Sequence, residues 1–402
     1  MGKKQEPLDI QTLYESALSH HQQGDIEQAI HFYSQVAACV PEVAGIHYNL
    51  GLAHFELAQF AEAVNAYSKA AELNPEDPDI FYNLGLACKK AGRHSEAEQA
   101  YLKALALTPD DHDILYNLGC CYLEAGSIEH ARKTFEALTD LEPDRVSALN
   151  NLAYINHLLG NYDRAKELYK QVVELDPGRQ SAQYMYSVLN GSTEKAPPRE
   201  YIRELFDRYS ESYDQCLVEN LECSLYNTMR KIFDETTPEK SVYEHGLDLG
   251  CGTGLTGEAF RSACRRLDGV DLSRKMIERA RSKNIYDDLH CNDIIEFLHE
   301  SGKTFDLMIA ADVLPYLGDL GPLFEAAASK STDDTIFCFS SEAAMKPEWV
   351  LQSSGRYAHH PGYIQKTAEQ TGWTVLQESQ ADIRKEKDQW VKGHIFVLGR
   401  QD

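Results

Sequence analysis

Glycines and acidic residues follow one another at a spacing that suits a ligand with a ribose and a cationic group. The segment Asp248–Gly254 has the sequence DLGCGTG and ends an apolar stretch. Its three glycines, which let the backbone turn sharply and lie against a ligand, are Gly250, Gly252 and Gly254. Asp248 can accept a hydrogen bond from an ammonium group, and Asp271, about 20 residues further on, can accept both hydroxyls of a ribose. These residues predict a nucleoside-binding site at the ends of two strands.

The same glycines formally match the dinucleotide fingerprint GxGxxG, over Gly252–Gly257. Three observations argue against a nicotinamide enzyme. Asp248 lies where dinucleotide folds prefer an apolar residue or glycine, and another acidic residue, Asp293, ends the predicted third strand. In addition, no domain with a hydride-transfer His or Tyr constellation follows. The dinucleotide interpretation is therefore the disfavoured alternative.

The motifs resemble those of class I S-adenosylmethionine-dependent methyltransferases: DxGxGxG from Asp248, then VD at Asp271, ND at Asp293 and ADV at Asp312. The resemblance implies that S-adenosylmethionine is the cofactor, with its methionine moiety on Asp248 and the glycine loop and its ribose on Asp271. It further implies contacts from Leu272, from Met276 packed on the adenine, from Asp293 with Ile294 at the adenine edge, and from Asp312.

The elements that must position these residues alternate in type from residue 242 onward. Short apolar strands are predicted at 243–249, 268–272, 289–291, 305–311, 335–341, 373–378 and 394–398, with amphipathic helices between most of them. This alternation predicts a mostly parallel seven-stranded sheet covered on both faces, which is a Rossmann-like methyltransferase domain over 242–402. The charged segment RKEKDQ is predicted to be the turn between the last two strands, which form an antiparallel edge.

A helical segment at 201–241 precedes the sheet and is predicted to be a lid, joined to the first half of the chain by a linker at 191–200. The linker contains Gly, Ser, Thr and a Pro-Pro pair. The lid contains FDxYxxxYD from Phe206 to Asp214, which resembles the corresponding segment of bacterial fusions of tetratricopeptide repeats to methyltransferases. The resemblance places Tyr209 or Tyr213 near the polar end of the cofactor, and packing is the alternative role for these tyrosines.

The first half of the chain has an internal period of 34 residues. Prolines recur at Pro41, Pro75, Pro109, Pro143 and Pro177, alanines at Ala29, Ala63, Ala97, Ala131 and Ala165, and aromatic residues at Tyr33, Tyr67, Tyr101, Phe135 and Tyr169. A small residue allows the turn between two antiparallel helices, and proline ends the second helix of each pair. The pattern resembles tetratricopeptide repeats and predicts an α-solenoid over 8–190, with five repeats and a capping helix.

Asparagine, a poor helix former, recurs in register in the first helix of successive repeats, at Asn49, Asn83, Asn117 and Asn151. The column resembles the asparagine ladder of O-linked N-acetylglucosamine transferases, whose amides hold an extended peptide in the concave groove. An amide offers both a donor and an acceptor, so it can pair with any peptide unit. The alternative is that asparagine is only part of the repeat consensus.

The 402 residues carry a formal net charge of −24, which excludes nucleic acid as an expected partner because phosphate binding needs a basic surface. The charge favours a basic protein or peptide partner, although it can also serve solubility alone. The ten cysteines show no metal-ligand spacing, so no metal is expected and reduced thiols in a cytoplasm are predicted. We expect no signal peptide and no membrane span, and no feature indicates the oligomeric state.

Four residues near the open end of the predicted sheet could contact the methyl acceptor: Tyr316, Arg356, Tyr357 and His359. They form no known catalytic constellation, so no catalytic base is assigned, and packing roles are the alternative. Tyr316 and Tyr357 are carried forward as candidate substrate-binding residues. The Asn/Asp-Pro-Pro-Tyr/Phe motif of amide and nucleobase N-methyltransferases is absent.

Three functions follow from these observations. The favoured hypothesis is a methyltransferase that acts on a protein or peptide recruited by the repeat groove. The alternative is a small-molecule methyltransferase whose repeats dock it to a partner protein. The third is a scaffold that only senses the cofactor, and the complete set of acidic residues argues against it.

Overall fold

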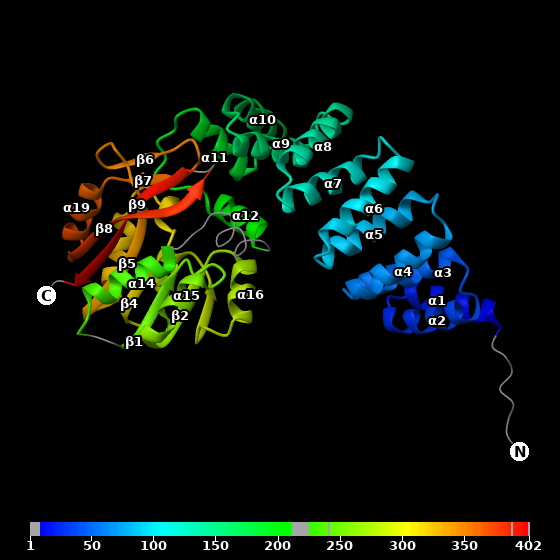
Figure 1. Ribbon diagram of the computed structural model, residues 1–402, viewed down its shortest axis with the longest axis horizontal. Coiled ribbons are helices and arrows are strands. Elements are labelled where there is room, and N and C mark those ends of the chain that lie inside the picture. The colour runs from blue at the N-terminus through cyan, green and yellow to red at the C-terminus, as the bar shows by residue number, and fades with distance from the viewer. Residues whose placement is uncertain (1–8, 211–224, 240–241, 387–388, 401–402) are drawn as a thin grey trace, which may run out of the picture. The chain divides into compact units, whose positions relative to one another are not determined.

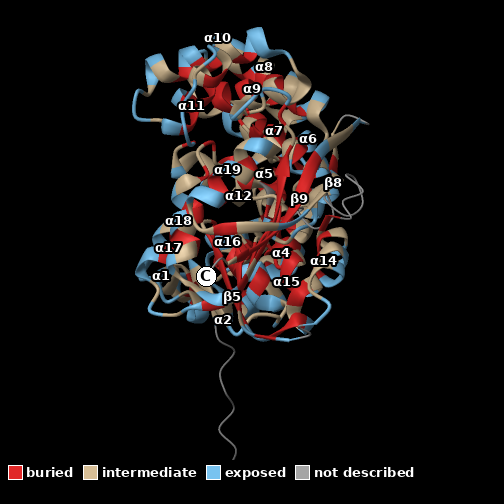
Figure 2. Cartoon of the chain, turned by 90° about the vertical axis from the view of Figure 1, so that its left-hand side faces the viewer, coloured by how far each residue is buried: buried red, intermediate tan, exposed pale blue. Residues whose placement is uncertain are grey.

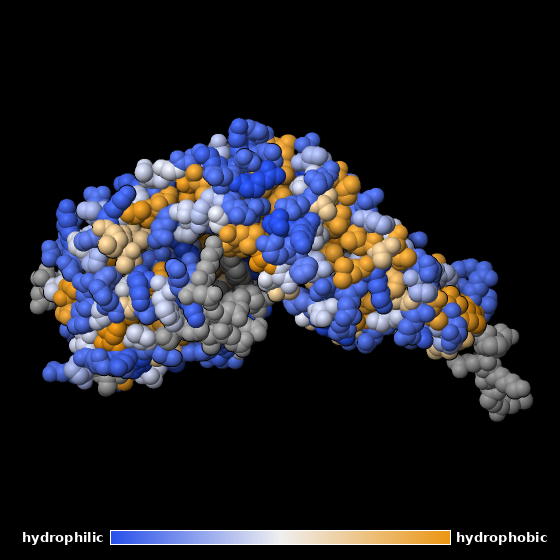
Figure 3. Space-filling model, turned by 45° about the horizontal axis from the view of Figure 1, so that its top comes forward, coloured by the Kyte–Doolittle hydropathy of each residue, from blue (hydrophilic) through white to orange (hydrophobic). Residues whose placement is uncertain are grey.

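The computed structural model describes residues 9–210, 225–239, 242–386 and 389–400. The chain separates into two compact units, Met1–Leu159 and Gly160–Asp402, and each is described by itself (Figure 1). Among the described residues, no helix has the length and apolar character needed to cross a membrane. Figure 3 shows hydrophilic and hydrophobic side chains interspersed on the viewed face.

The first unit consists of paired helices that repeat with the period of the sequence. The helices are α1 (Ile10–Gln22), α2 (Ile26–Cys39), α3 (Ala44–Glu56), α4 (Phe60–Leu73), α5 (Pro78–Lys90), α6 (His94–Leu107), α7 (His112–Glu124), α8 (Ile128–Leu141) and α9 (Val146–Leu159). The repeated aromatic residue of each second helix is fully buried within this unit. This architecture confirms the predicted tetratricopeptide-type solenoid.

A glycine in the first helix of a repeat packs against the aromatic residue of the second helix. A Cβ atom added to Gly51 would lie 2.7 Å from the Tyr67 ring, and one added to Gly85 would lie 2.6 Å from Tyr101. Such distances are far below ordinary van der Waals contact. The ring therefore fills the space that the missing side chain leaves, so the two columns of the repeat are physically coupled.

The turn between the two helices of each repeat needs a left-handed residue. Gly24, Gly92 and Gly126 have φ values of 80°, 73° and 73°, and nothing lies within 4 Å of a Cβ atom added to any of them. Ala58, the one exception to the glycine column, adopts the same conformation with φ 56°. Its turn therefore stores backbone strain that the other turns avoid.

We predict that Ala58→Gly stabilises the protein by about 0.5–1 kcal/mol, because relief of the left-handed strain outweighs the added freedom of the unfolded chain. Urea unfolding should show a higher midpoint with an unchanged slope. Gly92→Ala, the reverse change at the equivalent turn, should destabilise by a similar amount. A lower midpoint for Ala58→Gly would contradict the strain argument.

The second unit contains a seven-stranded sheet with strand order β3-β2-β1-β4-β5-β9-β8. Its strands are β1 (Tyr243–Leu249), β2 (Cys264–Asp271), β3 (Asp288–Cys291), β4 (Phe305–Ala310), β5 (Ser331–Glu342), β8 (Trp373–Glu386) and β9 (Gln389–Arg400). The first five pair in parallel and β9 pairs antiparallel with β5 and β8. This confirms the predicted Rossmann-like methyltransferase fold.

Helices cover both faces of this sheet and give it two apolar cores (Figure 2). The helices of this unit are α10 (Tyr162–Leu175), α11 (Gln180–Leu189), α12 (Arg199–Tyr209), α14 (Leu225–Thr236), α15 (Leu255–Phe260), α16 (Arg274–Ser282), α17 (Ile294–Glu300), α18 (Gly321–Ser329) and α19 (Pro361–Gln370). α17, α18 and α19 contribute to one core, and α14 and α15 contribute to the other. Burial on both faces accounts for the near-continuous apolar strands.

The last two strands are longer than predicted, so most of the charged segment RKEKDQ is strand rather than turn. A small hairpin that the sequence did not predict, β6 (Trp349–Leu351) and β7 (Tyr357–His359), follows β5. The unit also includes α10 and α11, and the Tyr184 hydroxyl of α11 donates to the Gly355 carbonyl at 3.0 Å. The ranges 8–190, 191–200, 201–241 and 242–402 inferred from the sequence remain predictions.

Candidate cofactor site

The glycine loop after β1 has a backbone that only glycine adopts readily. Gly250, Gly252 and Gly254 have φ values of 72°, 51° and 99°. A Cβ atom added to Gly250 would lie 2.5 Å from the side chain of Val313. The glycines therefore allow the loop after β4 to lie directly against the loop after β1.

Asp248, at the carboxyl end of β1, is fully buried. Its Oδ2 atom accepts a hydrogen bond from the Tyr286 hydroxyl at 2.6 Å, whereas its Oδ1 atom has no partner among the described residues. Burial raises the pKa of Asp248 to about 7, with Tyr286 opposing the shift and Asp271 adding to it. A buried acceptor without a donor is costly, and a ligand ammonium group would supply the missing donor.

Tyr286 is a site residue that the sequence did not reveal. Its ring fills the space beside three glycines, two of which belong to the GxGxxG match: Gly254, Gly257 and Gly269. The third glycine of that match is therefore needed to admit this tyrosine, which in turn orients Asp248. The only signal in the sequence was an aromatic residue within the polar segment KNIYDD, which suggests no particular role.

Asp271, at the end of β2, is 9% exposed and makes no ion pair with any described residue. Its two oxygens accept from the backbone nitrogens of Gly252, at 2.9 Å, and Ser273, at 2.8 Å. Burial raises the pKa of Asp271 to about 6, against the lowering effect of those two hydrogen bonds. Because a carboxylate has about four lone-pair sites, both oxygens can still accept a ribose hydroxyl.

The residues expected around the adenine follow β2 and β3. Met276 in α16 is fully buried, and Leu272 and Ile294 are half-buried. Asp293 caps α17, accepting from the backbone nitrogens of Ile295 at 3.0 Å and Glu296 at 3.1 Å through Oδ1. Only its Oδ2 atom is left for the adenine edge, and it lies 3.4 Å from the Arg199 guanidinium.

Helix α12 contacts the segments that follow three of the strands. The Asp207 carboxylate bonds the Ser273 hydroxyl at 2.5 Å, and Arg199 pairs with Glu296 at 2.6 Å. The ring of Phe206 meets that of Tyr316 edge-on, with centroids 5.1 Å apart. These contacts support a lid over the carboxyl ends of the strands. The side chain of Tyr209, together with Tyr213 and Asp214, lies outside the described residues, so the role of Tyr209 stays a prediction.

Asp312, directly after β4, adopts a left-handed conformation with φ 57°, which is strained for a residue other than glycine. Its Oδ1 atom accepts from Arg384 at 2.7 Å, and Arg384 also bonds Glu342 and Glu386. Arg384 is 2% exposed. Burial raises the pKa of Asp312 although Arg384 opposes the shift. The contact of Asp312 with the cofactor remains a prediction.

The candidate acceptor-side residues differ in their surroundings. Tyr316 is contacted by Phe206 and lies 6.0 Å from the Arg356 guanidinium. Tyr357 is fully buried and its hydroxyl donates to the Glu194 carbonyl at 2.7 Å, which favours the packing role, and its contact with a substrate stays a prediction. His359 is also fully buried, and burial lowers its pKa to about 4.

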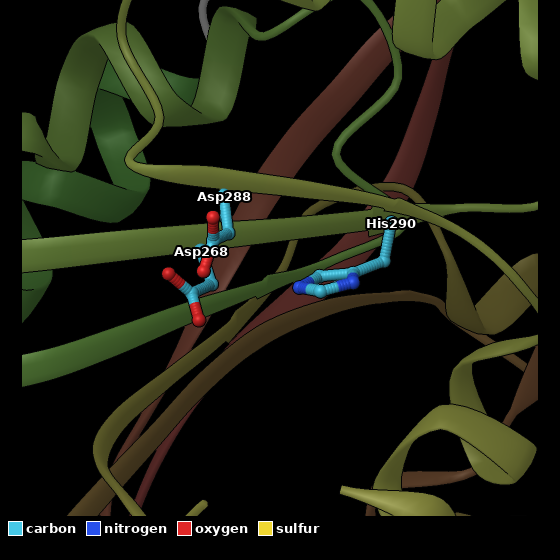
Figure 4. A group of neighbouring side chains, drawn as sticks. All are labelled: Asp268, Asp288 and His290. Atoms are coloured by element: carbon cyan, nitrogen blue, oxygen red, sulfur yellow. The ribbon is translucent and has the colours of Figure 1, made fainter.

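One group of side chains in the second unit has ligand atoms close enough to hold a metal ion: Asp268, Asp288 and His290. Figure 4 shows the two carboxylates side by side, with the His290 ring directed toward them. The Lys303 ammonium lies 2.7 Å from Asp268 and 3.1 Å from Asp288, and Arg266 pairs with both carboxylates. Protein cations already neutralise this group, so it gives no support to a metal site.

In the first unit, three members of the asparagine column share one geometry. The Nδ2 atoms of Asn49, Asn83 and Asn117 donate to the hydroxyls of Tyr14, Tyr48 and Tyr82, at 3.1, 3.1 and 3.2 Å. Asn151 differs, because it is 8% exposed and contacts the Cys120 sulfur at 3.8 Å. The tyrosines recur with the same 34-residue period, so the sequence contains a signal for these pairs.

The sheet, the glycine loop and the buried acids define a class I methyltransferase domain. Residues 247–337 match the family model described as a methyltransferase domain, and residues 9–186 match that of the cilia and flagella-associated protein 70 C-terminal domain, a tetratricopeptide-type family. The chain therefore joins a tetratricopeptide-repeat solenoid to a methyltransferase domain, as its motifs predicted.

Two curated relatives match a short part of the chain. Nodulation protein S of Rhizobium tropici is 32% identical over 82 residues, which is 20% of this chain and 34% of the relative. Ubiquinone biosynthesis O-methyltransferase of Coxiella burnetii is 32% identical over 80 residues, which is 19% of this chain and 34% of the relative. The chain thus spans about a third of the length of these relatives.

Solved structures resemble each part of the chain. The tetratricopeptide protein YrrB covers 44% of this chain and 91% of its own, with 22% identity and a TM-score of 0.41. An S-adenosylmethionine-dependent methyltransferase from Clostridium acetobutylicum covers 49% of this chain and 100% of its own, with 16% identity and a TM-score of 0.39.

Class I methyltransferases use S-adenosylmethionine, and the described residues fit that cofactor. The unpartnered Oδ1 atom of Asp248 suits the ammonium group of the methionine moiety. The glycine loop leaves room for a backbone approach, and the free lone pairs of Asp271 suit the ribose. The fit rests on buried acceptors without cationic partners, which a ligand must satisfy.

We predict that Asp271→Ala weakens S-adenosylmethionine binding at least tenfold with the fold intact. The variant leaves two ribose hydroxyls without an acceptor, each at a cost of about 1–3 kcal/mol. Isothermal titration calorimetry measures the affinity, and Asp333→Ala, an exposed carboxylate at the amino end of β5, is the matched control. Equal affinities for the wild type and Asp271→Ala would contradict the ribose assignment.

Cofactor affinity should fall as the pH is lowered from 7.5 to 6, because protonation of Asp248, with its pKa of about 7, removes the acceptor for an ammonium group. The stability of the free protein should respond in the opposite direction. A raised folded-state pKa means that the folded state binds the proton more tightly, so the contribution of Asp248 to stability is lost as the pH rises from about 4 to 7.

Thermal unfolding with and without cofactor, across this pH range, tests both signs. In Asp248→Asn the contribution of this group to both trends should disappear. A cofactor-induced shift in melting temperature that stays constant between pH 7.5 and 6 would argue against Asp248 as the ammonium acceptor.

Proposed function

We propose that this protein is an S-adenosylmethionine-dependent methyltransferase that methylates a protein or peptide substrate held by its repeats. The observation that carries the enzymatic part is the buried, unpartnered Oδ1 atom of Asp248 beside a glycine loop in a class I sheet. The observation that supports a polypeptide substrate is the repeated tyrosine–asparagine geometry of the first unit.

In this proposal the cofactor supplies a methyl group activated on a sulfonium. The residues of this chain bind it and exclude water. Asp248 accepts from the ammonium group, Asp271 holds the ribose, and Met276 packs on the adenine. Helix α12 covers the carboxyl ends of the strands through Phe206 and Asp207. A covered site strengthens each of these electrostatic contacts.

The acceptor enters, in this proposal, beside the loop after β4, where Asp312 and Tyr316 lie. Positioning an acceptor in line with the activated methyl group can lower the barrier by about 7–11 kcal/mol. A lysine amine must first lose its proton, which costs roughly 4–5 kcal/mol at neutral pH. The Asp312 carboxylate is already bonded to Arg384, so we assign neither an acceptor-binding role nor a catalytic base there.

The alternative function is a small-molecule methyltransferase whose repeats dock it to a partner. One observation favours it: a matched relative is named as a ubiquinone biosynthesis O-methyltransferase, although the match covers 34% of that protein. We place the reaction in the cytoplasm and expect a basic protein partner, as the net charge of −24 favours.

Incubation of the protein with methyl-labelled cofactor and an extract of its own organism tests the proposal. We expect label in protein bands, and none with the Asp271→Ala variant. Label found solely in small molecules would favour the alternative. Absence of transfer to any component, with cofactor binding intact, would contradict a methyltransferase function.

A further inference from the structure

Three rungs of paired side chains run along the first unit, each made of one tyrosine and one asparagine from successive repeats. They are Tyr14 with Asn49, Tyr48 with Asn83 and Tyr82 with Asn117. All six side chains are partly exposed. Three nearly equal distances in three successive repeats indicate a built feature rather than a chance contact.

Backbone carbonyls fix the orientation of the amides. The Nδ2 atom of Asn83 lies 2.8 Å from the carbonyl oxygen of Asp79, and that of Asn117 lies 2.9 Å from the carbonyl oxygen of Asp113. A carbonyl oxygen can only accept, so the amide atom facing it must be the nitrogen. The same nitrogen contacts the tyrosine hydroxyl, so both of its hydrogens are used within the protein.

This arrangement determines what each rung offers to a ligand. Because the tyrosine oxygen accepts from the asparagine, its own O–H hydrogen is directed elsewhere, and no described residue accepts it. The Oδ1 atom of each asparagine likewise has no donor among the described residues. The second and third rungs therefore each present one donor and one acceptor, the complement of a single peptide unit with its carbonyl and N–H groups. In the first rung the Asn49 amide contacts the Tyr14 hydroxyl in the same way.

The surroundings of the rungs are acidic. The carboxylates of Asp77 and Asp79 add to the burial effect that raises the pKa of Tyr48, and Asp111 and Asp113 act in the same way on Tyr82. Residues 1–159 contain 23 Asp and Glu against 10 Lys and Arg. A ligand with cationic side chains is therefore attracted to this surface.

The fourth pair, Tyr116 with Asn151, is also hydrogen-bonded, but Tyr116 has further side-chain hydrogen bonds with Ser147 and Cys120. Asn151 is 8% exposed and contacts Cys120, and the guanidinium of Arg145 lies over the Tyr116 ring at 4.9 Å. Arg145 also pairs with Asp113 at 2.9 Å. The fourth pair therefore uses more of its hydrogen-bonding groups within the protein than the first three pairs do, and the positive charge of Arg145 is compensated by Asp113 and Glu142.

We propose that the three rungs bind the main chain of an extended polypeptide that carries Lys or Arg side chains. Each tyrosine hydroxyl donates to a peptide carbonyl, and each asparagine Oδ1 accepts from a peptide N–H. The inference deepens the proposed function, on which it rests for the identity of the partner as substrate. It adds the tyrosine hydroxyls as ligand-binding groups, and it assigns the acceptor half of the recognition to the asparagines.

The test measures binding of a fluorescein-labelled (Lys-Ser-Gly)6 peptide to the full-length protein by fluorescence anisotropy at low salt, without cofactor. We expect the Tyr48→Phe/Tyr82→Phe double variant to bind at least about fivefold more weakly, because two hydrogen bonds of about 0.5–1.5 kcal/mol each are lost. The matched control is Tyr67→Phe/Tyr101→Phe, which removes two interior hydroxyls that have no partner and should leave binding unchanged.

A second peptide tests main-chain recognition without any mutation. (Lys-Ser-Sar)6, in which sarcosine replaces glycine, keeps the charge and removes every third N–H donor. We expect it to bind several-fold more weakly than the glycine peptide. Equal binding of the two peptides, or wild-type binding by the Tyr48→Phe/Tyr82→Phe variant, would overturn the proposal and leave charge alone as the source of affinity.

The Asp271→Ala variant separates this inference from the proposed function. It should bind the glycine peptide as the wild type does, because its change concerns the cofactor site. Peptide binding by the rungs without any transfer of label to protein would contradict the proposed function and leave the inference standing. If the Tyr48→Phe/Tyr82→Phe variant transfers label to protein and binds the peptide as well as the wild type does, the proposed function stands and the inference is contradicted.

Discussion

Two buried carboxylates without cationic partners are the constraint on which the second unit depends. Asp248 is fully buried and Asp271 is 9% exposed, and the described residues offer them only hydroxyl and backbone donors. Burying such charges costs stability, which the two apolar cores of the sheet must offset. The glycines admit Tyr286, whose hydroxyl bonds Asp248, and the backbone nitrogen of Gly252 bonds Asp271, so both carboxylates are fixed in orientation. The buried carboxylates thus lower the stability of the protein without cofactor, and they would strengthen binding of a cationic cofactor.

The same edge of the sheet uses a different solution on the acceptor side. There Arg384 bonds the strained Asp312 and the glutamates Glu342 and Glu386, and Arg356 pairs with Glu386, so two protein cations lie among these three carboxylates. The contrast separates the two halves of the site physically. In the proposed cofactor site, the carboxylates of Asp248 and Asp271 have no cationic partner among the described residues, and the positive charge of the cofactor would supply one. This ionic network bonds Asp312 in the loop after β4, and Val313 of the same loop packs on Gly250.

Periodicity and motif spacing were sufficient to predict the fold, because it depends on local backbone requirements, whereas the cofactor contacts of the individual residues stay predictions. A left-handed glycine or a 34-residue repeat leaves a mark at a fixed position in the sequence. The roles of Tyr286 and Arg384 were not predicted, since each acts through a long-range contact from a segment whose composition is typical of polar surface. Arg384 in particular was placed in a turn because its segment RKEKDQ is highly charged, whereas the strand that carries it extends to Glu386. The 34-residue recurrence of the tyrosines can be read from the sequence, but their hydrogen bonds to asparagines 35 residues away cannot.

Main-chain recognition has a consequence for how specificity is divided. Rungs that pair with peptide groups read no side chains, and the acidic surroundings select only for positive charge, so the repeats favour a class of segments rather than one sequence. Choice of the methylated atom must then arise at the loop after β4, where Asp312 and Tyr316 lie. Such a division lets the repeat surface change its charge pattern, and hence its partners, without altering the buried carboxylates that hold the cofactor.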